Sequence, residues 1–185
     1  LEGLPNYAYL MAKSPVTWPT VNITPGTPFM ERLSQYLHSK QIVDRVKNGR
    51  NVEYIISDTH EIGEGEKKIV NYIDSRVSAD DSVMIYSPDA DVVLLCMLLQ
   101  NKTVWMLKHD QQASERARRN VYDLIDINLL KENISYYVNK TNVNQVAHDI
   151  VCLSTLFGND FVPKIESISV KNFQLIMDIY QQVLT

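Results

Sequence analysis

Apolar residues between positions 50 and 110 alternate between short strand-like runs and longer runs with helical spacing. The strand-like runs are Val52–Ile56, Ser82–Tyr86 and Thr103–Leu107, which are rich in β-branched, aromatic and other apolar residues. Between them, Gly63–Ile73 has helical periodicity, and Ala90–Leu99 is apolar on nearly all sides, as in a buried helix. Strands that alternate with helices form parallel sheets with right-handed crossovers. The pattern therefore predicts an α/β fold with an open, mainly parallel sheet flanked by helices.

The segments before this alternation predict a lead-in and one helix. Residues 1–26 are rich in proline and lack sustained periodicity, so we expect an extended lead-in. Thr27-Pro28 is typical of a helix start, with Thr as N-cap and Pro at the first helical position. The apolar stripe that follows predicts a single helix to about Val46.

The segments after the third strand predict a loop, an edge strand and three helices. Residues 108–120 are polar and basic and predict an irregular connection, and Val121–Ile125 predicts a further strand or edge piece. Helical spacing then returns three times, at residues 128–138, 142–157 and 170–180.

Composition is ordinary for one globular domain. The chain has 185 residues, of which 45% are hydrophobic and 22% charged, and this length supports one core, so we expect a single domain over residues 1–185. A net charge of −4 argues against binding nucleic acid through overall charge. Cys96 and Cys152 lie in apolar runs and are predicted to act as small hydrophobes without a disulfide. This favours a reducing compartment, the cytosol or nucleus, and no apolar run is long enough for a membrane span.

The stretch from Ser57 to Asp91 carries nine acidic and three basic residues, a formal charge of −6. Two acidic couplets, Glu64/Glu66 and Asp89/Asp91, follow the first and second predicted strands. Ligands of open parallel sheets bind beyond the carboxyl ends of the strands, so we expect both couplets at one edge. Two carboxylates 4 Å apart repel by about 4 kcal/mol at an effective dielectric constant near 20. Such a cluster needs positive charge, and a divalent metal is the leading candidate.

Each couplet alone has a simpler explanation. Acidic residues are enriched in the first turn of helices, so either couplet taken singly is more readily a helix cap. Two couplets in equivalent positions, together with Asp160 in Gly-Asn-Asp-Phe, shift the balance towards a site of five carboxylates. Oxygen ligands suit Mg²⁺ or Mn²⁺. Two such ions about 3.5–4 Å apart activate a water and stabilise the leaving oxygen of a phosphodiester.

Basic residues near these acids have two interpretations each. Lys67 and Lys68 directly follow the first couplet and either neutralise it or contact a substrate. Arg116, Arg118 and Arg119 belong to a segment with a local charge of +3, which would suit phosphate groups. A solvated loop is the favoured alternative for the arginines, because most charge runs are solvated surfaces.

Four motifs in order closely resemble signatures of the 5′→3′ exoribonuclease (Xrn) family, relatives of the flap endonucleases among the PIN-like nucleases. They are N-I-T-P-G-T-P-F-M at Asn22–Met30, G-E-G-E-K-K-I at Gly63–Ile69, S-P-D-A-D at Ser87–Asp91 and L-F-G-N-D-F-V-P at Leu156–Pro163. The resemblance covers about residues 20 to 165. Four ordered motifs are far more specific than a single D-x-D pair.

The resemblance implies that Glu64, Glu66, Asp89, Asp91 and Asp160 bind two Mg²⁺ or Mn²⁺ ions. It also implies an enzyme that removes nucleotides from the 5′ end of single-stranded RNA bearing a 5′-monophosphate. The family often has His-Lys where this chain has Lys67-Lys68, and its linkers are short here, which suggests a compact, divergent, viral member. The family's first acidic ligands and its 5′-phosphate-binding residues come from a segment upstream of such motifs. We therefore expect the second portion of a nuclease domain, incomplete at its N-terminus and inactive or weakly active without the rest of the same chain.

Two alternatives remain open. A structure-specific DNA flap nuclease resembles this pattern, but flap enzymes place a glycine-containing DNA-gripping hairpin after the last motif, and all six glycines here lie at or before Gly158. A degenerate nuclease fold that serves as an RNA-binding scaffold is the other alternative. Five intact carboxylates argue against it, because a scaffold has no need of them.

Overall fold

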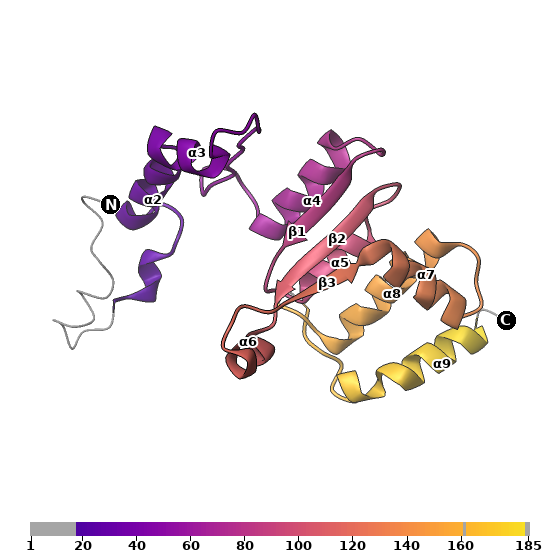
Figure 1. The fold of residues 1–185 in the computed structure, drawn as a ribbon. Coiled ribbons are helices and arrows are strands. Elements are labelled where there is room, and N and C mark those ends of the chain that lie inside the picture. The colour runs from indigo at the N-terminus through magenta and orange to yellow at the C-terminus, as the bar shows by residue number, and fades with distance from the viewer. Residues whose placement is uncertain (1–17, 161, 184–185) are drawn as a thin grey trace. The chain divides into compact units, whose positions relative to one another are not determined.

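The computed structural model describes residues 18–160 and 162–183 (Figure 1). The chain divides into two compact units, the first ending at Gly63 and the second beginning at Glu64. The single domain expected over residues 1–185 stays a prediction.

Short helices make up the first unit, namely η1 (Thr20–Asn22), α2 (Pro28–Leu37) and α3 (Lys40–Lys47). Helix α2 begins as expected, with the Thr27 side chain accepting a hydrogen bond from the Met30 N–H at 3.4 Å. The single helix predicted to Val46 is wrong, because the chain turns at His38 and extended Ser39 before α3 starts. Residues 1–17 of the predicted lead-in lie outside the described residues.

The strand predicted at Val52–Ile56 is wrong. This segment has no helix or strand structure. Its apolar side chains remain accessible, with Val52 41% and Ile55 52% exposed. A strand exists only through hydrogen bonds to a neighbouring strand, and the pattern of apolar residues does not reveal whether that neighbour is present.

The second unit holds a three-stranded sheet and the remaining helices (Figure 1). In chain order these are α4 (Gly65–Arg76), β1 (Ser82–Tyr86), α5 (Asp91–Met97), β2 (Thr103–His109), α6 (Gln111–Ala117), β3 (Tyr122–Asp126), α7 (Ile127–Tyr137), α8 (Val143–Ser154), η2 (Thr155–Phe157), η3 (Val170–Asn172) and α9 (Phe173–Val183). The α/β class with a helix-flanked sheet is confirmed.

The strand order is β1-β2-β3, with β1 parallel and β3 antiparallel to β2. One of the two pairings is thus parallel, and the predicted edge piece at 121–125 is β3. The antiparallel return arises because residues 110–121 form a wide hairpin, closed by the Asp110 N–H donating to the Val121 carbonyl at 3.0 Å. Helix α6 lies at its tip, where an irregular connection was expected (Figure 1).

The core lies on one face of the sheet. Ile85, Val104 and Met106 alternate with more exposed neighbours, and they belong to one buried cluster with side chains of α5, α7 and α8. Met84 and Tyr86, on the opposite face of β1, are 61% and 60% exposed. Among the described residues, no helix is long and apolar enough to cross a membrane.

The two cysteines differ in environment. Both are free thiols, as predicted. Cys96 is fully buried and acts as a small hydrophobe. Cys152 is exposed, so the prediction that it serves the core is wrong. The apolar run around Cys152 forms α8, and a helix buries only one of its faces.

Candidate functional site

Helix α4 places the first acidic couplet beside the second. After α4 and a short turn, β1 runs back in the opposite direction, so the first turn of α4 lies near the carboxyl end of that strand (Figure 1). Asp89 follows β1 directly and Asp91 opens α5, which contacts α4. We expected the couplets to meet because two parallel strands would deliver them. The structure instead brings them to the same end of the sheet because α4 and β1, the strand after it, run in opposite directions (Figure 1).

The charges of these acids act on one another. Partial burial raises the pKa of the Glu66 carboxyl, and the charges of Glu64 and Asp89, then of Asp91, raise it further. The positive charge of Lys67 lowers the Glu66 pKa. The structure therefore brings four of the five predicted carboxylates into one electrostatic group.

Helix capping explains only one of these four side chains. Asp89 accepts the Asp91 N–H at 2.9 Å and so supports the start of α5. Glu64 is the N-cap residue of α4 but makes no capping hydrogen bond with its side chain. Its carboxylate lies 3.5 Å from the Lys67 ammonium instead. Lys67 thus neutralises part of the cluster, one of the two roles expected for it.

The donor set suits a hard divalent cation, since all four groups are carboxylates. Within the described ranges, however, no three Asp, Glu, His or Cys side chains form a metal-binding group. Glu64, Asp89 and Asp91 are exposed, and packing does not hold their rotamers. The chemistry of the residues fits Mg²⁺ or Mn²⁺, and the ligand assignment stays a prediction.

Asp160 lies in an exposed turn after η2. This turn needs the glycine before it. Gly158 has φ +80°, and a Cβ atom there would lie 2.6 Å from the backbone nitrogen of Lys164. Asp160 is not among the charges found to act on Glu66, so its role as a fifth ligand stays a prediction.

The candidate substrate-binding residues are all accessible to some degree. Lys68 is half-buried on α4, and Arg116 is exposed in the last turn of α6. Arg118 and Arg119 are exposed just beyond it, in the wide hairpin between β2 and β3. A phosphate-binding role for these four residues stays a prediction.

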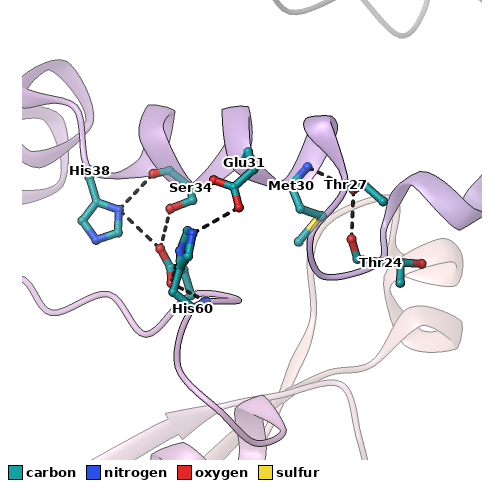
Figure 2. A network of polar contacts seen from close by, with 8 residues as sticks. Thr24, Thr27, Met30, Glu31, Ser34, His38 and His60 are labelled. Atoms are coloured by element: carbon teal, nitrogen blue, oxygen red, sulfur yellow. Dashed lines mark hydrogen bonds and ion pairs between the residues drawn. The ribbon is translucent and has the colours of Figure 1, made fainter.

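Sequence reasoning missed a polar network in the first unit that includes Glu31, Ser34 and His60 (Figure 2). Asp58 accepts hydrogen bonds from the Ser34 hydroxyl and, at 2.9 Å, from the His60 N–H. The His60 ring lies 3.1 Å from both the Asp58 and Glu31 carboxylates. The Ser34 hydrogen bond, followed by that of His60, holds the pKa of Asp58 far below its usual range. This network ties α2 to the loop that precedes Glu64. The only available signal was the spacing S-D-T-H, in which an Asp accepts a backbone N–H two residues on.

The His60 bridge predicts a pH-dependent stability. The hydrogen bond to Asp58, then the charge of Glu31, raises the His60 pKa above its ordinary value of 6.5. Because the folded-state pKa is raised, the stabilisation is complete below the ordinary pKa and is lost as pH rises through the raised one. We expect an NMR titration of the His60 ring to have its midpoint above 6.5.

Glu31→Gln should lower this midpoint, whereas the control Glu53→Gln, at an exposed position, should leave it unchanged. A midpoint at or below 6.5 in the unmodified chain would contradict the bridge.

The class of protein follows from the fold and the site together. A helix-flanked α/β sheet with an acidic cluster at the carboxyl end of its first strand is consistent with part of a PIN-like nuclease domain. Residues 6–110 match the model of the XRN 5′-3′ exonuclease N-terminus family. The chain belongs to this family.

Three relatives illustrate the similarity. A protein of Acanthamoeba polyphaga mimivirus, named as a candidate 5′-3′ exonuclease, is 51% identical over 97% of this chain and 31% of its own length. The 5′-3′ exoribonuclease 2 of Candida glabrata is 29% identical over 93% of this chain and 21% of its own length. The 5′-3′ exoribonuclease 1 of Schizosaccharomyces pombe is 27% identical over 88% of this chain and 14% of its own length. The chain therefore spans less than a third of each of these relatives.

Proposed function

We propose that this chain supplies part of the catalytic domain of a divalent-metal-dependent 5′→3′ exoribonuclease. One observation carries the proposal, the coupling of Glu66 to Glu64, Asp89 and Asp91 at one end of the sheet. Like charges kept together at an accessible site are costly unless a cation joins them. Membership of the XRN family and the relatives named exoribonucleases favour RNA over DNA as the substrate.

The side chains have distinct roles in this proposal. The four clustered carboxylates, together with Asp160, hold Mg²⁺ or Mn²⁺. Two such ions supply an activated water and charge stabilisation for the leaving oxygen of the phosphodiester. Lys67 offsets the negative charge of Glu64 next to the cluster. Lys68 and the three arginines near α6 bind phosphates of the RNA backbone.

The proposed enzyme needs more than these residues. The rest of the same polypeptide supplies the remaining acidic ligands and the groups that bind a 5′-monophosphate. A reducing compartment, the cytosol or nucleus, suits two free thiols of which one is exposed.

The activity is tested with the full-length polypeptide, Mg²⁺ or Mn²⁺, and substrates labelled at the 5′ end. We expect release of labelled mononucleotides from 5′-monophosphorylated RNA, with slower release from RNA that carries a 5′-hydroxyl or triphosphate. EDTA should stop the reaction.

If cleavage is confined to DNA flaps, the protein is a flap nuclease and the proposal is wrong. RNA binding without hydrolysis under any metal condition would replace it with a scaffold.

A further inference from the structure

Lys131 is a buried cation in the core of the second unit. It lies on α7, its residue is only 5% exposed, and its Nζ donates to the Leu99 carbonyl at 3.0 Å. Burial lowers the pKa of this ammonium, and no acidic side chain contributes to the shift. A buried charge with one backbone acceptor is costly, so its place in the fold needs an explanation.

The acceptor of this hydrogen bond lies just beyond α5, in the residue that follows its C-cap residue Leu98. This helix has seven residues, and the Leu99 N–H donates to the Cys96 carbonyl immediately beyond its last turn. Carbonyl groups at a helix C-terminus lack partners and carry partial negative charge, which a lysine ammonium complements. A helix this short has little stability of its own, so tertiary contacts decide its position.

The N-terminal end of α5 belongs to the candidate site. Its first residue is Asp91, one of the charges that act on Glu66. A displacement of α5 along its axis would therefore move Asp91 relative to the other carboxylates. Val92, Cys96 and Met97 pack α5 into the core, and the Lys131 hydrogen bond adds a directed contact just beyond its C-terminal end.

Helix α4 has the same arrangement. The Lys102 ammonium donates to the carbonyl of Val77, the C-cap residue of α4. The first turn of α4 carries Glu66. A lysine ammonium thus binds a backbone carbonyl at or just beyond the C-terminus of each of these two helices.

We infer that Lys131 is a positioning residue that anchors the C-terminal end of α5 and thereby sets the place of Asp91 in the carboxylate cluster. Lys102 does the same for α4 and Glu66. That the cluster binds a metal rests on the proposed function. The anchoring of the two helices does not depend on it.

The experiment uses the full-length polypeptide with Lys131→Met, Lys131→Arg and a control, Lys171→Met, at an exposed position. Hydrogen exchange of the α5 amides is measured without metal, and Mn²⁺ affinity is measured separately by titration. Lys131→Met should speed exchange in α5 and weaken Mn²⁺ binding by about 2–30-fold, the range for coupling carried through a packed helix. Lys131→Arg keeps a donor and should restore most of both properties, and Lys171→Met should change neither.

Lys102→Met provides a second test at a less buried site. It should speed exchange at the C-terminal end of α4 rather than in α5, and it decides the question if Lys131→Met does not fold. Unchanged helix exchange in the folded variants, or faster exchange with unaltered Mn²⁺ affinity, would overturn the positioning role. Wild-type protein that fails to bind Mn²⁺ would overturn the proposed function, and the exchange data alone would then decide the anchoring.

Discussion

Asp91→Ala is expected to lower the rate of RNA degradation by the full-length polypeptide by about 10²–10⁴-fold, the range seen when one directly acting group is removed. Asp91 begins α5 and is one of the carboxylates that raise the pKa of Glu66. Without it, the cluster loses a cation ligand and part of the charge that attracts the metal. Rates with saturating Mn²⁺ and 5′-labelled RNA provide the measurement.

The substitution should leave the fold intact. Asp91 is exposed, and its hydrogen bond to Asp89 uses the backbone N–H rather than the carboxylate. Circular dichroism should therefore match that of the parent protein. Asp80→Ala, in the exposed turn before β1, is the matched control and should keep full activity. A folded Asp91→Ala protein that digests RNA at the parent rate would refute the metal-site assignment.

Met106→Ala is expected to lower the free energy of unfolding by about 2–5 kcal/mol, the usual cost of truncating a fully buried methionine. Met106 is 0% exposed at the centre of β2, where the sheet meets the core helices. The substitution removes both apolar contact and volume that the neighbours cannot refill. Urea denaturation of the chain, with a check that the m-value is unchanged, measures the loss.

Met84 offers a matched control in the adjacent strand. Met84→Ala removes the same atoms from a side chain that is 61% exposed, so the expected change is within about 0.5 kcal/mol. Equal losses of unfolding free energy for Met106→Ala and Met84→Ala would contradict a core that lies on only one face of the sheet. They would mean that the outer face of the sheet is as closely packed as the inner one.

Local signals predicted most elements of the second unit. The N-cap of α8 is a clear example, since Asn142 accepts the backbone N–H three residues ahead, as its sequence context suggested. Thr27 does the same for α2 in the first unit. Strands β1 and β2 also match the predicted runs almost residue for residue. These features depend on interactions within a few residues, which a sequence displays directly.

Predictions that needed a distant partner were less successful. Val52–Ile56 has the composition of a strand, but no strand pairs with it among the described residues. Residues 111–117 have too few apolar positions to reveal α6, which depends on Asp110 as a cap. Cys152 sits in an apolar run, and only packing decided which face of α8 is buried.

In the stretch from Ser57 to Asp91, the sequence determined some features of the candidate site and the tertiary structure determined others. The sequence alone determined that two acidic couplets follow one another within this strongly negative segment, and which motifs place the chain beside the exoribonucleases. Only the tertiary structure decided that Glu64 and Glu66 lie at the same end of the sheet as Asp89 and Asp91, because β1 runs back in the opposite direction after α4. It also decided that Lys131, more than thirty residues from Leu99, supports the far end of α5. Charge and local propensity are properties of neighbours in sequence, whereas the spacing of the carboxylates depends on packing between elements.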